Sequence, residues 1–201
     1  MTGKGIPDYL NIMNKELITE IQKRRAYRDF QKKQAPQDSI DRIIRAGHLA
    51  PSCFNSQSWR FLIMNDPDSL EKGFSVLTKG NQWARESAFL VAAATRDDLD
   101  CMLSDSRNYA LFDTGLAVQN MILQAVKEGM TGHPMAGFNP VKLKELFEIP
   151  ENYRVITLIA FGYLMDDFKP EEYKPRERKP LEEVFFFNRW NAREESEQDS
   201  I

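Results

Sequence analysis

Residues 107–139, RNYALFDTGLAVQNMILQAVKEGMTGHPMAGFN, form the stretch around which the rest of the chain is organised. Its first two thirds are apolar on almost every face of a helix, and the few polar positions collapse into one narrow stripe. A helix with that pattern is a buried one. We expect Ser104 or Ser106 to cap its start and Gly129 to end it in a left-handed conformation.

The seven residues after this helix, GHPMAGF at 132–138, are unusual for a simple linker. Two glycines and a proline predict an irregular backbone, yet Met135 and Phe138 are too apolar to be left in water. Such a segment suits one wall of a ligand site, where exposed backbone N–H groups need a partner. The alternative is an ordinary loop between two helices.

The chain as a whole has the composition of one globular domain of 201 residues, 42% hydrophobic, with a net charge of -3. That charge gives no general attraction to nucleic acid or to an anionic membrane. The two cysteines form no CxxC pair and cannot support a disulfide framework, which favours a reducing cytoplasm. No apolar run approaches the ~20 residues of a membrane span, and the first residues lack the apolar core of a signal peptide. We therefore expect a soluble, cytoplasmic protein.

Hydrophobic periodicity divides the chain into helices and a few strands. Helices are expected over residues 14–22, 36–47 and 68–79 and from Asn139 or Pro140, and buried strands over 59–64, 88–94 and 155–163. Residues 1–13 are expected to be an arm, 181–190 an apolar C-terminal extension and 191–201 a disordered tail. Because helices and strands are mixed without strict βαβ alternation, the pattern predicts a single α+β domain over residues 1–201.

Most common catalytic motifs are absent. The two histidines, His48 and His133, lie in unrelated settings, so we expect no histidine-based metal site. No GxGxxG, P-loop or GxSxG sequence is present. Cys53 has no neighbouring His or Lys that would lower its pKa, which favours a small packing residue over a nucleophile.

The basic cluster of Arg24, Arg25 and Arg28 has three interpretations. It is a solvated charged face, a nucleic-acid patch or a phosphate clamp. The acidic net charge argues against the second, while guanidinium groups match phosphate oxygens in bidentate geometry. A second basic set, Arg176 and Arg178, precedes Pro180, and the two sets could close on one phosphate.

Taken together, four segments resemble the FMN-dependent nitroreductase family. RRAYRDF at 24–30 and APSCFNSQSW at 50–59 are similar to the family's RRSxRxF and APSxxNxQPW. Residues 132–139 resemble its PxxGF(D) flavin loop, and RERKP at 176–180 its C-terminal basic motif. The four occur in the family's order over nearly the whole chain.

The resemblance implies a nitroreductase-like α+β fold with a central mixed sheet flanked by helices. It also implies an intertwined homodimer with one FMN in each of two interface sites. In such a dimer the segment 181–190 would extend over the other protomer, whereas the alternative is that it folds back on its own domain. Extension would bring Arg176 and Arg178 to a flavin near the interface.

Site residues follow from the resemblance, position by position. Those assigned to the FMN phosphate are Arg24, Arg25, Arg176 and Arg178, with Ala26 where the family commonly has serine. Arg28 would approach the pyrimidine edge of the flavin, where positive charge stabilises the reduced cofactor. The backbone N–H of Ala136 would face flavin N5. The residues that line the ring would be Pro134, Met135 and Gly137. The second subunit would contribute Pro51, Ser52, Cys53 and Asn55. Separately, Asn81 would contact the polar edge of the ring.

The activity implied is ping-pong: NAD(P)H gives a hydride to flavin N5 and leaves, and an oxidised acceptor replaces it. A nitroaromatic, a quinone or a similar flat electrophile would be the acceptor, and no side chain is assigned as an obligate acid or base. A flavin-dependent enone reductase or dehydrogenase of the same superfamily fits nearly as well. From other classes, a non-enzymatic flavin-binding protein and a nucleic-acid binder through residues 23–33 stay open. Neither the choice between NADH and NADPH nor the acceptor follows from the sequence.

Overall fold

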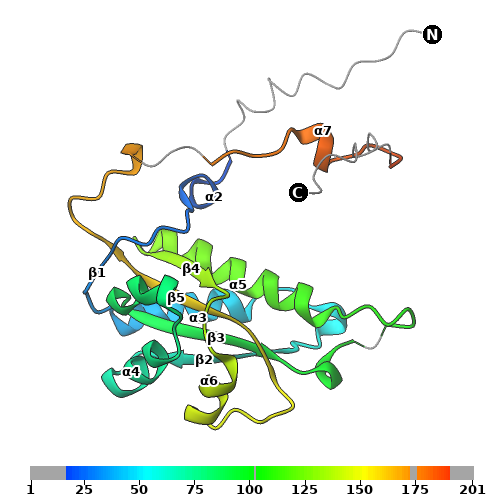
Figure 1. The fold of residues 1–201 in the computed structure, drawn as a ribbon. Coiled ribbons are helices and arrows are strands. Elements are labelled where there is room, and N and C mark those ends of the chain that lie inside the picture. Colours follow the sequence, from blue (N-terminus) through cyan, green and yellow to red (C-terminus); the bar gives the residue numbers. More distant parts are fainter. Residues whose placement is uncertain (1–16, 102, 173–175, 191–201) are drawn as a thin grey trace, which may run out of the picture. The chain divides into compact units, whose positions relative to one another are not determined.

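The computed structural model describes residues 17–101, 103–172 and 176–190. The chain divides into two compact units, one up to Asp166 and one from Asp167 onward, and each is described by itself. The first unit holds the sheet and its covering helices (Figure 1). In the second, the described elements are a 3-10 turn at Pro170–Glu172 and the short helix α7, Leu181–Val184. The expected arm at 1–13 and tail at 191–201 lie outside the described residues.

A five-stranded sheet forms the centre of the first unit. Its strands are β1 (Phe30–Gln31), β2 (Trp59–Met64), β3 (Phe89–Thr95), β4 (Thr131–Met135) and β5 (Arg154–Leu164). The order is β1-β5-β3-β2, with β4 also paired to β5. The α+β class is confirmed, but the sheet expected to be mixed is antiparallel in every strand pair of the described residues. Met64 at the end of β2 pairs with Leu90 at the start of β3, so the intervening segment returns to the same end of the sheet instead of crossing it.

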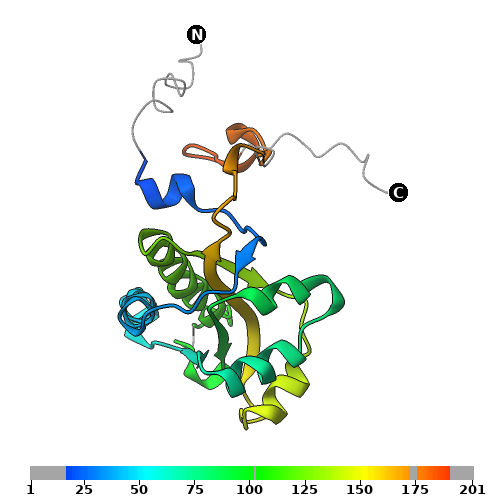
Figure 2. The ribbon, with the colours of Figure 1, turned by 90° about the vertical axis from the view of Figure 1, so that its left-hand side faces the viewer.

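Helices cover both faces of this sheet (Figure 2). On one face Ile40 and Ile43 of α3 (Gln37–His48) and Met121 of α5 (Ala110–Lys127) pack against Phe89 and Phe161 of the sheet. The other face carries α4 (Pro67–Ser75), the 3-10 segment η2 (Lys79–Glu86) and α6 (Pro140–Leu146). Alternate residues of β3 and β5 serve the two cores, as strand geometry requires. Each fully buried Leu, Ile or Phe contributes about 1.5–3 kcal/mol.

Several predicted elements are confirmed with nearly the expected bounds. β2 matches residues 59–64, and β3, β5 and α3 differ from their predictions by one residue at either end. Asn139 caps α6, because its Oδ1 accepts the N–H of Lys142 at 3.0 Å. α4 is shorter than predicted and ends at Ser75. Of the helix expected over 14–22, the described part is α2, Thr19–Lys23.

The central helix α5 is present, but the prediction that it is buried all round is wrong for a single chain. Leu111 and Phe112 are 40% and 56% exposed. Two residues of its polar stripe instead turn inward: Asp113 is 1% exposed, and Asn120 donates to the carbonyl of Ala46 in α3 at 3.2 Å. Hydrogen-bond partners on neighbouring segments make that burial possible.

The ends of α5 give one correction and one confirmation. Neither Ser104 nor Ser106 caps the helix, which begins at Ala110 after Tyr109. Asp100, which lies outside the helix, satisfies one backbone donor at this end, because its Oδ2 accepts the Tyr109 N–H at 2.8 Å. Gly129 has φ of 76°, the left-handed conformation predicted for it.

Residues 131–135 form a regular strand, where an irregular backbone was expected. The glycine at 132 serves close packing: a Cβ there would lie 2.7 Å from Phe161 Cε1 and 3.0 Å from Ile122 Cγ1. Met135 and Phe138 are buried, as their apolar character predicted. The local pattern therefore gave the burial correctly and the backbone incorrectly, since strand pairing with β5 satisfies the N–H groups.

No helix among the described residues combines the length and the apolar character that crossing a bilayer requires.

Candidate functional site

The basic segment 24–28 is held to strand β4 by two side chains of that strand. Thr131 Oγ1 donates to the carbonyl of Arg25, and His133 Nδ1 donates to the carbonyl of Tyr27, each at 2.9 Å. A carbonyl can only accept, so this geometry places the hydrogen of the imidazole on Nδ1. The arginine cluster is thus fixed through its backbone, and Arg28 is exposed.

An aromatic group lies next to this segment. The ring of Trp83, from η2, is 4.5 Å from that of His133 and 5.6 Å from that of Phe30. The guanidinium carbon of Arg28 lies 5.7 Å from the Trp83 ring, within range of a cation–π interaction. Trp83 Nε1 is buried and has no hydrogen-bond partner among the described residues. An indole N–H of that kind normally finds an acceptor, and a bound molecule is one way to supply it.

The loop after β4 is pinned by its Gly137 carbonyl. That oxygen accepts three hydrogen bonds: from the Thr78 N–H at 3.1 Å, the Thr78 hydroxyl at 2.9 Å and Asn81 Nδ2 at 2.9 Å. A Cβ at position 137 would lie 2.7 Å from both Asn81 Nδ2 and Thr78 Oγ1, so only glycine fits. Ala136 is exposed, and nothing in the described part of the chain accepts its backbone N–H. The loop therefore presents a fixed, available donor.

The loop before β2 has an unusual backbone. Phe54, Asn55 and Gln57 all have positive φ, at 48°, 58° and 47°. Such conformations cost free energy in residues other than glycine and persist only where the surroundings enforce them. Here the Cys53 N–H donates to Asp113 Oδ2 at 3.0 Å, and Ser52 Oγ accepts the N–H of Gln57 at 3.0 Å.

A disulfide joins Cys53 to Cys101, with their Cα atoms 5.7 Å apart. Cys53 was expected to be a small packing residue, and its bond to Cys101 corrects that expectation. They lie 48 residues apart, and only the fold brings them to bonding distance. The cysteine-based argument for a reducing compartment therefore loses its basis, and the cytoplasmic location stays a prediction.

Burial raises the pKa of the Asp113 carboxyl, and the nearby Asp100 carboxylate raises it further, while the Cys53 N–H opposes both. The same carboxyl links the strained loop to the sheet-covering helix α5. Asp113 therefore has a structural role near the start of α5.

The predicted site residues separate into three groups. The first unit brings the 24–28 segment close to β4, the loop 134–137 and Asn81. The loop at residues 51–55 is instead bonded to the start of α5, whereas β4 follows its end. In the sheet, β5 and β3 separate β4 from β2, the strand that follows this loop. At about 4.8 Å per strand, about 14 Å lie between β4 and β2 in one chain. Arg176 and Arg178 are exposed in the second unit.

Four residues of this region were missed by sequence reasoning: Thr78, Trp83, Thr131 and His133. Their contacts join segments that are between 50 and 106 residues apart in sequence, and no local pattern marks such pairs. The alternation of Thr131 and His133 on one face of a strand is the only signal available, and it required β4 to be recognised as a strand. Asn81 Nδ2 donates to the carbonyl of Gly137, and the expected contact of Asn81 with the flavin stays a prediction.

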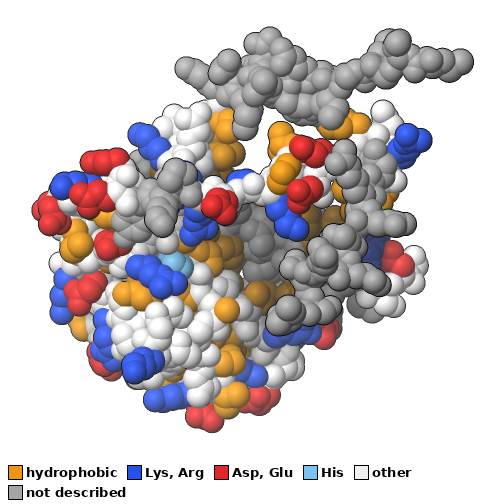
Figure 3. Space-filling model, turned by 45° about the horizontal axis from the view of Figure 1, so that its top comes forward, with side chains coloured by type: hydrophobic (Ala, Val, Ile, Leu, Met, Phe, Trp, Pro, Cys, Tyr) orange, Lys and Arg blue, Asp and Glu red, His pale blue; other side chains and the backbone are white. Residues whose placement is uncertain are grey.

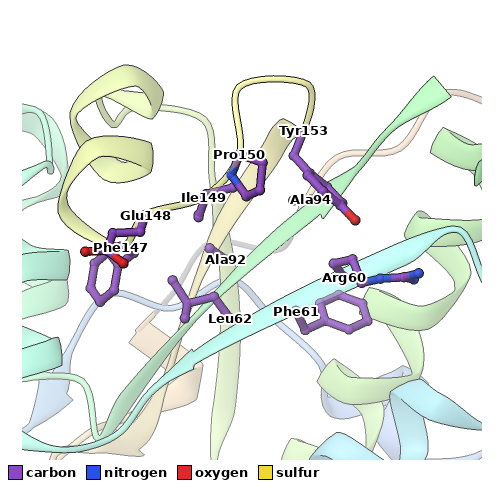
Figure 4. Close-up of a pocket in the computed structure, with 10 residues that line it drawn as sticks. All are labelled: Arg60, Phe61, Leu62, Ala92, Ala94, Phe147, Glu148, Ile149, Pro150 and Tyr153. Carbon is purple, nitrogen blue, oxygen red and sulfur yellow. The ribbon is translucent and has the colours of Figure 1, made fainter. Parts of the chain in front are cut away.

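A separate cavity of about 350 Å³ lies between strands β2 and β3 and the segment 147–153 (Figure 4). Leu62, Ala92 and Ala94 form its floor, with Arg60 and Tyr153 toward one end and Phe147 toward the other. No predicted site residue lines it. A site that a second chain completes does not form a closed cavity in a single chain. The presence of this pocket is therefore compatible with a ligand site around β4.

Charged side chains of the visible face in Figure 3 are mixed, with Lys and Arg among Asp and Glu instead of in one continuous basic surface. Among the described residues, no group of three or more His, Cys, Asp or Glu side chains is arranged to hold a metal ion. The arginines and the fixed backbone donor thus suit an anionic organic molecule better than a metal.

This antiparallel sheet with helices on both faces is an α+β fold, and arginines and a backbone donor gather at its strand β4. The family model described as the nitroreductase family matches residues 21–102 and 77–163. The chain belongs to the nitroreductase family and is an oxidoreductase.

Individual relatives agree with this assignment. A putative NADH dehydrogenase/NAD(P)H nitroreductase of Archaeoglobus fulgidus is 31% identical over 159 residues, which cover 76% of this chain and 87% of that protein. The crystal structure of an oxidoreductase containing FMN has 28% identity and a TM-score of 0.77, with 90% and 96% of the two chains covered. An enone reductase of gut-bacterial fatty acid saturation shares the fold at 17% identity, with a TM-score of 0.73 and coverage of 88% and 99%.

Proposed function

We propose that the chain is an FMN-dependent enzyme that uses NAD(P)H to reduce a flat electrophilic acceptor, such as a nitroaromatic or a quinone. The observation that carries this proposal is the convergence of the arginine segment, the Trp83 indole and the free Ala136 N–H around β4. The NAD(P)H and FMN named for its relatives support it.

The residues present fit FMN. The guanidinium groups of Arg24 and Arg25 carry the charge and the paired donors that a phosphate takes, although Arg25 Nη1 here donates to the Arg24 carbonyl at 3.1 Å. Arg28 offers a cation for the pyrimidine edge of the ring. Ala136 has an available backbone N–H for flavin N5, on a loop that the Gly137 carbonyl fixes. Pro134 and Met135 precede that donor, with Pro134 exposed and Met135 buried under the loop. When bound, the cofactor would supply the hydride chemistry, and the chain would bind and orient it.

A phosphate clamp formed by the two arginine sets is part of the proposal. Arg176 and Arg178 would join Arg24 and Arg25 on the phosphate. Replacing Arg178 with Ala should weaken FMN binding by about 1.5–3 kcal/mol, the range for a hydrogen bond to a charged group. Arg154→Ala is the matched control, because that arginine pairs with Asp97 on the surface. Unchanged FMN affinity in both Arg24→Ala and Arg178→Ala, measured by fluorescence titration, would exclude the clamp.

A homodimer would complete the site. Phe54 is 86% exposed, and the loop that carries it is bonded to the half of α5 where Leu111 and Phe112 face solvent. Apolar side chains at one end of a helix are normally covered by a partner. Such a partner would receive Pro51, Ser52, Cys53 and Asn55 beside its flavin.

Gly115 gives this dimer a sharp test. It lies exposed on α5 after Leu111 and Phe112, and a Cβ built there has no neighbour within 4 Å. Gly115→Leu should therefore leave a monomer intact but weaken association if α5 approaches a second chain. Sedimentation of this variant against Glu145→Leu, an exposed position on α6, distinguishes an interface effect from general hydrophobicity. A wild-type protein that is monomeric and flavin-loaded at micromolar concentration would contradict the dimer.

The C-terminal segment 181–190 would reach over the partner. In the second unit Phe185, Phe187 and Trp190 are exposed, and the rings of Phe186 and Trp190 are 4.4 Å apart. Truncation after Lys179 should remove both dimer stability and FMN, whereas removal of 192–201 should cost neither. A truncated chain that stays dimeric and yellow would mean that this segment covers only its own domain.

An enone reductase is the second candidate. The neighbouring structure of that activity supports it through the fold alone. Steady-state assays separate the two candidates: oxidation of NAD(P)H with a nitroaromatic or quinone favours the first, and saturation of an α,β-unsaturated ketone favours the second. A colourless protein that binds no FMN would refute both.

A further inference from the structure

The peptide unit between Tyr27 and Arg28 is held by an imidazole. His133 Nδ1 donates to the Tyr27 carbonyl at 2.9 Å, and that carbonyl shares a rigid plane with the Arg28 N–H. Fixing the carbonyl therefore fixes the peptide plane that carries the Cα atom of Arg28. The Arg28 side chain itself is exposed, so a contact at its guanidinium end is needed to restrict its rotamers.

The guanidinium end of Arg28 contacts Trp83, which lies next to the His133 imidazole. Its guanidinium carbon lies 5.7 Å from the Trp83 ring, and Trp83 lies 4.5 Å from the His133 ring. Phe30, 5.6 Å from Trp83, supports the indole from the other direction. Backbone and guanidinium of Arg28 are thus oriented by one aromatic pair, His133 and Trp83.

We infer that His133 and Trp83 are positioning residues for Arg28, and that they set the ease of reduction of the cofactor. This inference rests on the proposed function, in which Arg28 supplies positive charge to the pyrimidine edge of FMN. A cation near that edge favours the reduced, more negative cofactor over the oxidised one. A displaced Arg28 would lose this preference while the phosphate contacts of Arg24 and Arg25 persist.

Thr131 provides the matched control. It stands two residues from His133 on the same strand face and makes an equivalent 2.9 Å bond, but to the carbonyl of Arg25 in the phosphate group. Thr131→Val should weaken oxidised and reduced FMN equally, because a phosphate contact does not change on reduction. His133→Phe should instead weaken the reduced form more than the oxidised form.

The experiment measures the two-electron reduction potential of bound FMN and its dissociation constant in wild type, His133→Phe, His133→Asn, Arg28→Gln and Thr131→Val. In His133→Phe the preference for reduced FMN should fall about tenfold, which is about 30 mV for a two-electron couple. In His133→Asn, whose amide can occupy the position of Nδ1, the preference for reduced FMN should stay within about threefold of the wild-type value. Thr131→Val should change affinity without a change in potential.

A double variant separates positioning from general damage. In His133→Phe/Arg28→Gln the potential should equal that of Arg28→Gln alone, because the histidine acts only through the arginine. If His133→Phe fails to load FMN, Trp83→Phe serves in its place. Unchanged potential in FMN-loaded His133→Phe, or an additive double variant, overturns the inference but leaves the proposed function standing. Failure of the wild type to bind FMN overturns both.

Discussion

The backbone N–H of Cys53 donates to Oδ2 of Asp113 at 3.0 Å, which ties the loop before β2 to a carboxyl that is 1% exposed on α5. Cys53 is also bonded to Cys101, so the loop is attached to its surroundings both covalently and through its backbone. Three non-glycine residues with positive φ follow within four positions. The attachments explain how such a backbone persists.

Asp113 makes stability depend on pH. Its pKa is raised above the ordinary 3.8, chiefly by burial, so the folded state holds the proton more tightly than the unfolded chain. Stability therefore falls as the pH rises from 3.8 through the folded pKa. Asp113→Asn keeps an acceptor for Cys53 and has no charge to bury, so it should be more stable than wild type at neutral pH.

Urea unfolding from pH 3 to pH 8 checks this. The advantage of Asp113→Asn should vanish at the acidic end and grow toward neutrality. Asp113→Ala leaves the Cys53 N–H unpaired and should cost about 1–3 kcal/mol. A pH-independent difference between Asn and wild type would contradict the assignment.

The disulfide should contribute to stability. It closes a loop of 48 residues in sequence separation, for which the chain-entropy argument gives an upper value of about 4 kcal/mol and typical disulfides give about 2–4 kcal/mol. Cys53→Ser/Cys101→Ser should lower the unfolding free energy by that amount. Reductant should lower the melting temperature of the wild type and leave this variant unaffected, and a titration that finds two free thiols in the native protein would exclude the bond.

Glu128 should be a second pH-sensitive point. Its carboxylate accepts from Arg42 Nε at 2.7 Å and also from Ser39 and Gln124, and these donors lower its pKa from 4.5 to about 2, Arg42 most of all. A lowered pKa gives stability that is fully present above 4.5 and is lost as the pH falls toward 2. Because Arg42 is half exposed and its charge is screened, we expect Glu128→Gln to cost about 1–3 kcal/mol at pH 7.

The matched control is Glu71→Gln, an exposed carboxylate that pairs with Arg85. It should cost less than about 1 kcal/mol. Equal effects of the two substitutions in urea unfolding at pH 7, or no convergence of Glu128→Gln with wild type at pH 2, would argue against a special role of Glu128.

Gly132 should not tolerate a side chain. A Cβ there would lie 2.7 Å from Phe161, inside the core between β5 and α5, so Gly132→Ala should cost about 1–3 kcal/mol through overpacking. Gly80→Ala, where nothing lies within 4 Å, should stay within about 0.5 kcal/mol of wild type. Thermal unfolding of the pair is the measurement, and a neutral Gly132→Ala would mean that the ring of Phe161 yields.

What the sequence by itself determined is the set of elements whose causes are local. The bounds of β2, the Asn139 cap of α6 and the left-handed Gly129 each follow from residues within a few positions of one another. The family motifs are likewise short and contiguous, and for that reason the residues alone indicate the nitroreductase family. Each of these features depends on residues within about one helix turn or one strand.

Only the tertiary structure decided which segments meet. β4 is a strand because β5 pairs with it, although its own Gly-His-Pro sequence suggests a loop. Asp113 is buried because a donor arrives from Cys53, 60 residues away, and His133 finds its acceptor 106 residues away in Tyr27. A buried polar group is stable only when its partner is in place, and the fold as a whole supplies that partner.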